Sequence, residues 1–158
     1  MTDAAPEDFV DFLRCLVAAE CDFLVVGAHA LAVHGSPRAT GDLDVLVRAD
    51  ADNAPRVLAA LREFGAPLAM HGITERDFRV PGLVYQMGLP PRRIDVLTQI
   101  TGVSFDDATV GAVTGSIGGV SIRCIGLEAM LKNKLAAGRA KDLADAEILR
   151  QLRDRSPA

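Results

Sequence analysis

The stretch at residues 34–47, HGSPRATGDLDVLV, places two aspartates where a loop enters an apolar run. Its Ser-Pro and Thr-Gly steps oppose helix formation and predict a loop. The apolar residues after them predict a strand. Successive side chains of a strand point to opposite faces of the sheet. We therefore expect Asp42 and Asp44 to emerge on one face while Leu43 turns into the core.

Two carboxylates on one face can share one or two hard cations, and Mg²⁺ or Mn²⁺ suits such ligands. Asp95, in the run RRIDVLT, is the only acid inside a strand-like segment elsewhere in the chain. If its strand lies beside the Asp42–Asp44 strand, the three acids converge and can hold two ions for a phosphoryl-type displacement. The alternative is that Asp-Leu-Asp is a solvated turn, which is the commoner role of an Asp that follows Gly.

Gly27 stands upstream, at the end of the apolar run CDFLVVG and at the start of a short predicted helix, AHALAVHG. A position without a side chain lets a phosphate approach the free N–H groups at the beginning of a helix. Gly27 alone is weak support, because glycine commonly ends strands. Combined with Asp42 and Asp44 it predicts a phosphate-binding turn next to a metal site.

The blocks VVGA, DLDV and RIDV together resemble the signature of the polymerase-β-type nucleotidyltransferase superfamily. In more detail the chain resembles small bacterial nucleotidyltransferase-like proteins related to the abortive-infection toxin nucleotidyltransferases. That second resemblance rests on GAHALAVHGSPRATGDLDVLV and on the late block KLAAGRAKDLADAEIL. It extends from about Phe23 to Leu149.

The resemblance implies a nucleoside triphosphate as substrate and Mg²⁺ or Mn²⁺ as cofactor. Asp42 and Asp44 would bind the metal, and Asp95 would complete the catalytic triad and help to activate an acceptor hydroxyl. The residues implied to bind the nucleotide lie at the glycine turn, in the following loop and in the late block: Gly27, Ala28, Ser36, Arg38, Thr40, Lys134, Arg139 and Lys141. Ala28 departs from the usual Gly or Ser and lacks a hydroxyl to donate to a phosphate. Cations in the late block would stabilise charge on the leaving pyrophosphate.

Asp142 and Asp145, also in the late block, have two interpretations of equal weight. They either belong to the nucleotide site or serve locally, as acids near a helix start or as ion-pair partners of Arg139 or Lys141.

The remaining patterns predict an α/β fold: a small mixed β-sheet flanked by helices, with a C-terminal helical pair, in a single domain over 1–158. Helices are predicted over 6–20, over 51–65 with Asp52 or Asn53 as the cap, and in two parts after 126, joined near Gly138. Two strand segments around a Pro-Gly turn are predicted within 78–88, and short strands alternating with turns over 108–125.

The composition of the chain limits the kinds of partner that we expect it to bind. The net charge is −4 and no basic run occurs, which argues against wrapping of nucleic acid over a broad face. A local contact with an RNA end stays open. Three cysteines without metal-ligand spacing indicate a reducing compartment. No apolar run is long enough to span a bilayer, and the N-terminus is acidic, so we expect a cytoplasmic protein without a membrane partner.

Three functions fit these patterns. The first is a metal-dependent nucleotidyltransferase that moves a nucleoside monophosphate to a tRNA, protein or small-molecule acceptor. In one version of this function the protein is a toxin and has a cognate antitoxin. The second is a catalytically silent member of the same fold that acts as a binding partner or regulatory subunit. The third is a two-metal phosphohydrolase, which would release only free nucleotide products.

Overall fold

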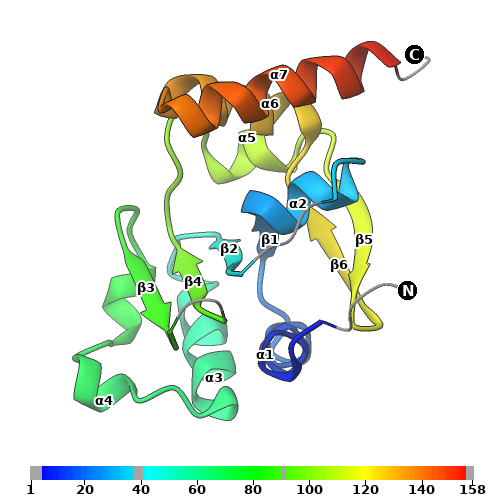
Figure 1. Ribbon diagram of the computed structural model, residues 1–158. Helices are drawn as coiled ribbons and strands as arrows, with labels where there is room; N and C mark the ends of the chain where they lie inside the picture. Colours follow the sequence, from blue (N-terminus) through cyan, green and yellow to red (C-terminus); the bar gives the residue numbers. More distant parts are fainter. Residues whose placement is uncertain (1–4, 38–40, 90–91, 156–158) are drawn as a thin grey trace.

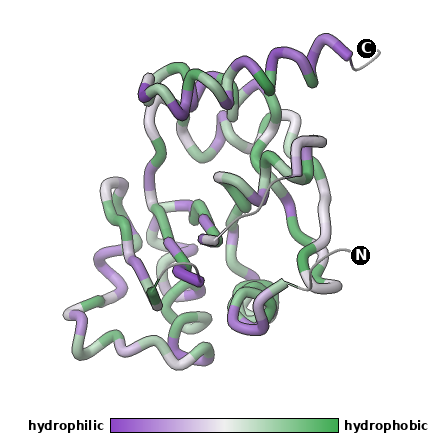
Figure 2. The backbone as a smooth tube through the Cα atoms, in the orientation of Figure 1, coloured by the Kyte–Doolittle hydropathy of each residue, from purple (hydrophilic) through white to green (hydrophobic). Residues whose placement is uncertain are grey.

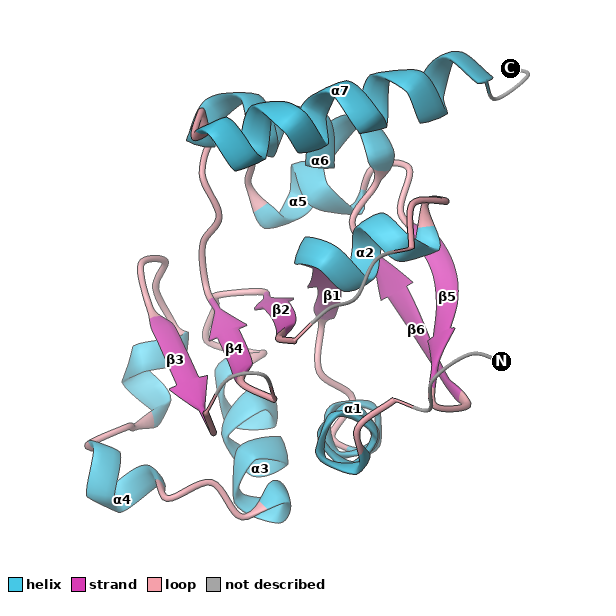
Figure 3. Ribbon diagram, in the orientation of Figure 1, coloured by secondary structure: helices cyan, strands magenta, loops and turns pink. Residues whose placement is uncertain are grey.

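A six-stranded mixed sheet forms the centre of the protein (Figures 1 and 3). The computed structural model describes residues 5–37, 41–89 and 92–155. The strand order is β3-β4-β2-β1-β6-β5. The strands are β1 Phe23–Val26, β2 Leu43–Val47, β3 Val84–Met87, β4 Ile94–Leu97, β5 Val113–Ile117 and β6 Val120–Cys124. The predicted α/β class with a small mixed sheet is confirmed.

Helices lie on both sides of the strands. They are α1 Glu7–Ala18, α2 Gly27–Val33, α3 Ala54–Phe64, α4 Leu68–His71, α5 Phe105–Thr109, α6 Leu127–Ala137 and α7 Ala140–Arg155, with a 3₁₀ helix, η1, at Glu75–Phe78. The helices α1 and α3 pack together, as do the C-terminal pair α6 and α7. Figure 1 shows these two pairs at opposite ends of the molecule, with the strands between them.

Apolar spacing explains the helices that were predicted. The three-and-four spacing in α1 buries Phe9, Phe12, Leu13 and Leu16 completely. Figure 2 shows hydrophobic residues concentrated in α1 and the strands, whereas α7 is largely hydrophilic. Gly65 and Gly138 end α3 and α6 in the left-handed conformation, as glycine does at helix ends.

Two predicted elements differ from the structure. The expected strand segment at 78–80 instead contains the last residue of η1, Phe78, followed by a turn. Thr74 and Asp77 form a reciprocal capping box at the start of that helix. Phe78 is fully buried from this helical turn rather than from a strand. The region predicted as short strands begins with the end of α5, whose cap Ser104 accepts a hydrogen bond from the Asp107 amide at 3.0 Å.

Asn53 stands at the predicted cap position of α3, but its side chain makes no capping hydrogen bond. Its Oδ1 accepts from the Asp22 amide at 2.8 Å, and its Nδ2 donates to the carbonyl oxygens of Asp22 and Arg48. Asn53 thereby joins the start of β1 to the end of β2. In the described part of the chain no helix has the length and apolarity needed to cross a membrane.

Candidate functional site

Strand pairing brings the three acids together. β2 and β4 are parallel neighbours in which Asp44 lies opposite Asp95, and β1 pairs antiparallel with β2 so that Val26 lies opposite Asp44. Paired residues on adjacent strands present their side chains on the same face. Asp42 stands two residues before Asp44, and Leu43 between them is fully buried, as expected. The carboxylates therefore gather where β1 ends and β2 begins.

Crowding of these carboxylates changes the proton affinity of Asp44. Burial, the charge of Asp95, a hydrogen bond with Asp95 and the charge of Asp42 together raise the pKa of Asp44 to about 7. A hydrogen bond between two carboxyl groups requires a proton on one of them. In the absence of a cation, Asp44 keeps its proton to a higher pH than an ordinary aspartate does.

Arg93 is a member of this cluster that the sequence analysis missed. Its Nη2 lies 3.1 Å from Asp42 Oδ2, and its Nε lies 2.9 Å from Asp95 Oδ1. The guanidinium thus bridges the first and third acids. A signal was available, because Arg93 stands two residues before Asp95 in a strand-like run, and that spacing puts both side chains on one face.

Gly27 lies directly against Asp44. It adopts a φ of +69°, in the left-handed region, and a Cβ built there would come within 2.3 Å of Asp44 Oδ2. A side chain at this position would therefore meet the carboxylate, and the backbone conformation itself disfavours any residue with a Cβ. The turn between β1 and α2 and the acid cluster consequently form one local structure.

The donor set fits a hard divalent cation, although the side chains are not arranged around one. Among the described residues no group of three or more His, Cys, Asp or Glu side chains has the geometry of a metal site. Arg93 instead neutralises two of the acids. Asp42 Oδ1, however, is buried and has no hydrogen-bond partner among the described residues, which is costly for a carboxylate oxygen. Three carboxylates with one unsatisfied oxygen are suitable ligands for Mg²⁺ or Mn²⁺.

The other residues expected near the glycine turn are only partly described. Ala28 is the second residue of α2, and Ser36 follows that helix, where its amide donates to the Leu31 carbonyl at 3.0 Å. Arg38 and Thr40 lie outside the described residues.

The late block forms a second charged cluster, at the junction of α6 and α7. Lys134 Nζ lies 3.1 Å from Asp145 Oδ2 and 3.6 Å from Asp142 Oδ1. Arg139 Nε donates to Asp142 Oδ2 at 2.6 Å, and this hydrogen bond is the main cause of the lowered pKa of Asp142. Both aspartates are buried. The pair of Asp142 with Arg139 is one of the local contacts expected, whereas Lys134, the partner of Asp145, was not among them. Lys141 is exposed on α7.

The comparisons identify similar folds among solved structures. No protein-family profile matches the chain, and no curated protein matches its sequence. The antibiotic-resistance factor ANT(2'')-Ia in solution is 14% identical, with a TM-score of 0.55 over 91% of this chain and 81% of its own. A provisionally assigned nucleotidyltransferase, TM1012 of Thermotoga maritima, is 16% identical, with a TM-score of 0.53 over 94% and 91%. The lincosamide antibiotic adenylyltransferase LnuA, bound to lincomycin, is 12% identical, with a TM-score of 0.51 over 96% and 99%.

Proposed function

From the nucleotidyltransferase fold that it shares with these proteins, we propose that the chain transfers a nucleoside monophosphate from a triphosphate to an acceptor hydroxyl or amine, with release of pyrophosphate. The observation that carries the proposal is the convergence of Asp44 with Asp95 across β2 and β4, with Gly27 packed against Asp44. An acid cluster beside a side-chain-free turn is suited to holding a cation and a phosphate together.

Asp42, Asp44 and Asp95 would hold Mg²⁺ or Mn²⁺, and the bound cation would neutralise charge on the phosphates. The carboxylates must be ionised to do so, hence the proton held by Asp44 must leave. Asp42 Oδ1, which has no hydrogen-bond partner in the described part of the chain, would supply a lone pair. Arg93 must move off Asp42 and Asp95 or rearrange, since it occupies donor oxygens of both. Asp95 would then be placed to accept the proton of the acceptor hydroxyl.

We also propose nucleotide-binding roles for the remaining residues, and their contacts support these roles to different degrees. Gly27 and Ala28 at the start of α2, with Ser36, Arg38 and Thr40 after it, belong to the connection that leads into the acids. Lys134 and Arg139 are engaged by Asp142 and Asp145, so a phosphate would have to compete with these carboxylates. Lys141 is exposed and is the weakest of the three.

Among the possible acceptors, a small molecule that bears a hydroxyl group is the one supported by the proteins of similar fold. One solved structure of ANT(2'')-Ia contains adenylyl-2''-tobramycin, and LnuA is bound to lincomycin. A tRNA end or a protein remains in the proposal as an acceptor, with growth inhibition and a cognate antitoxin as the corresponding biology. Expression of the chain with and without its genomic neighbour, scored by growth, tests that version.

The direct test incubates the protein with α-labelled nucleoside triphosphates, Mg²⁺ and total cell extract. We expect label in an acceptor fraction together with pyrophosphate. Asp44→Asn should lower the rate by at least about a hundredfold, whereas Asp52→Asn, an exposed acid in the turn before α3, should leave it unchanged.

The outcomes separate the alternatives. Free labelled nucleotide without a labelled acceptor would indicate a phosphohydrolase. Absence of metal-dependent nucleotide binding in titration calorimetry of the wild-type protein would favour the catalytically silent binding partner instead. That reading has a specific structural basis in Arg93, which already neutralises two of the acids without a metal.

A further inference from the structure

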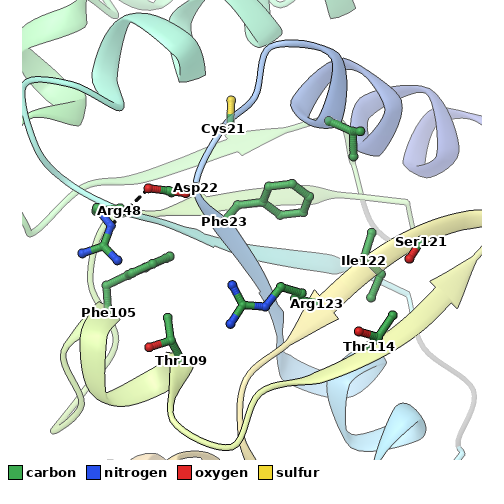
Figure 4. Close-up of a pocket in the computed structure, with 11 residues that line it drawn as sticks. Cys21, Asp22, Phe23, Arg48, Phe105, Thr109, Thr114, Ser121, Ile122 and Arg123 are labelled. Atoms are coloured by element: carbon green, nitrogen blue, oxygen red, sulfur yellow. Dashed lines mark ion pairs between the residues drawn. The ribbon is translucent and has the colours of Figure 1, made fainter.

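A cavity of about 360 Å³ lies between the start of β1 and the strand β6, closed on one side by α5 (Figure 4). It is separate from the acid cluster. Phe23, at the cavity, pairs with Val47, whereas Asp44 pairs with Val26 three residues further along β1. That spacing corresponds to roughly 10 Å along the strands. In the described residues β1 and β6 are paired at one position, Val25 with Cys124, and the cavity lies beside the earlier residues Phe23 and Ile122 of these strands.

On the β2 side, the cavity is lined by Arg48, whose side chain is held by several contacts and paired with carboxylates. Arg48 Nη1 donates to Asp106 Oδ1 at 2.6 Å, and Arg48 Nε lies 3.4 Å from Asp22 Oδ2. Its guanidinium also stacks on Phe105, 4.5 Å from the ring centroid. Arg48 is therefore held in place, and its charge is already offset by two carboxylates.

Arg123 supplies a cation of a different kind. It is exposed on β6, opposite Thr114 of β5, and within the described residues it forms no ion pair. Figure 4 shows its side chain extending from β6 across the cavity toward Thr109 and Phe105 of α5. Arg123 is thus a cation of the cavity lining that has no ion-pair partner among the described residues. Its guanidinium can donate two parallel hydrogen bonds to a carboxylate or phosphate.

The lining around Arg123 combines flat apolar surface with hydroxyl groups. Phe23, Ile122 and Phe105 belong to the apolar part of the lining, and Thr109 and Thr114 contribute hydroxyl groups. Such a mixture, mostly apolar with a few placed polar groups, is typical of small-molecule sites. We propose that this cavity binds a small aromatic anion, with its ring against Phe23 and Phe105 and its negative group on Arg123.

The test uses benzoate and phenyl phosphate as probes, benzamide as their neutral counterpart and inorganic phosphate as the anion without a ring. Binding is followed by amide chemical shifts in ¹H–¹⁵N spectra of the full chain. We expect benzoate or phenyl phosphate to bind with a dissociation constant on the order of 1 mM, shifting amides of Phe23, Thr114 and Arg123. Benzamide and inorganic phosphate should each bind at least about tenfold more weakly. The stronger of the two aromatic probes identifies the anionic group as carboxylate or phosphate.

Matched variants assign the binding to the cavity. Arg123→Gln should weaken binding of the stronger probe by at least about tenfold, and Phe105→Leu should weaken it severalfold. Arg76→Gln, which removes an exposed arginine from η1, should leave it unchanged. Asp44→Asn should bind the probe as the wild type does, so failure of the transferase proposal would not affect this result. Equal binding by Arg123→Gln and wild type, shifts confined to the acid cluster, or no binding of either aromatic anion would overturn the proposal.

Discussion

At the scale of single residues, the crowding of three carboxylates determines the electrostatics of the acid cluster. Arg93 neutralises Asp42 and Asp95 through two ion pairs. Asp44 receives less of this compensation, and its pKa rises to about 7 through burial and its acidic neighbours. Without a metal, the folded chain therefore favours the protonated form of Asp44.

The first prediction concerns the pH dependence of stability in the presence of a chelator. Asp44 titrates with a pKa of about 7 in the folded chain and 3.8 when unfolded, so between these values only the folded state holds the proton. The free energy of unfolding should therefore fall as the pH rises through this window, by at most about 1.4 kcal/mol per pH unit.

Urea unfolding at several pH values between 4 and 7 measures this slope. In Asp44→Asn the contribution should be absent, whereas Asp52→Asn should retain it. Identical pH profiles for Asp44→Asn and the wild type would show that Asp44 does not cause the effect.

The second prediction concerns Gly27. Gly27→Ala must place a methyl group against Asp44 in a left-handed backbone conformation, so it should destabilise the chain by about 2 kcal/mol or more and abolish nucleotide transfer. Gly72 has nearly the same φ, +67°, but open space where its Cβ would lie. Gly72→Ala is therefore the matched control, with an expected cost of about 1 kcal/mol from the backbone alone.

Urea unfolding and the labelled-nucleotide assay compare the two variants. Equal losses of stability and activity in both would mean that contact with Asp44 is irrelevant.

At the scale of elements, short-range hydrogen bonds determine where the observed secondary structure differs from the one that the apolar pattern predicts. The capping box of Thr74 and Asp77 begins η1 where a strand was expected. Ser104 likewise begins α5 before the predicted strands. The Asn53 side chain has the opposite role, because it leaves its own helix uncapped and joins two strands instead.

The third prediction follows from these contacts of Asn53. Asn53→Ala would remove three partly buried hydrogen bonds, one from an amide and two to carbonyls, which should cost about 2–3 kcal/mol of unfolding free energy. Asn133→Ala, which removes one exposed side-chain hydrogen bond to Thr101, should cost less than about 1 kcal/mol. Chemical denaturation of both variants provides the measurement, and a larger loss in Asn133→Ala would refute the assignment.

At the scale of the whole molecule, the C-terminal helical pair depends on buried charge. Lys134 of α6 is a basic partner of two buried aspartates of α7, of which Asp142 also pairs with Arg139. Removing one member of a buried ion pair leaves the other charge uncompensated.

The fourth prediction is that Lys134→Met lowers the free energy of unfolding by about 3 kcal/mol or more, while Lys141→Met, at an exposed site, changes it by less than about 0.5 kcal/mol. Thermal and urea unfolding measure both. Nucleotide binding that falls in Lys134→Met without a loss of stability would instead show that Lys134 serves the nucleotide rather than the helical pair.

The sequence by itself determined the α/β class, most helices and strands, and the common face of Asp42 and Asp44. These features follow from apolar spacing, glycine positions and the two-residue period of a strand, all of which act over a few residues. Tertiary structure alone decided that Asp95 lies opposite Asp44, that Arg93 bridges two of the acids and that Lys134 pairs with α7. It also decided that residues of β1, β5, β6 and α5 line a common cavity. Strand neighbours and register are set by how the whole sheet buries its faces, and no local pattern specifies which distant strand will lie alongside.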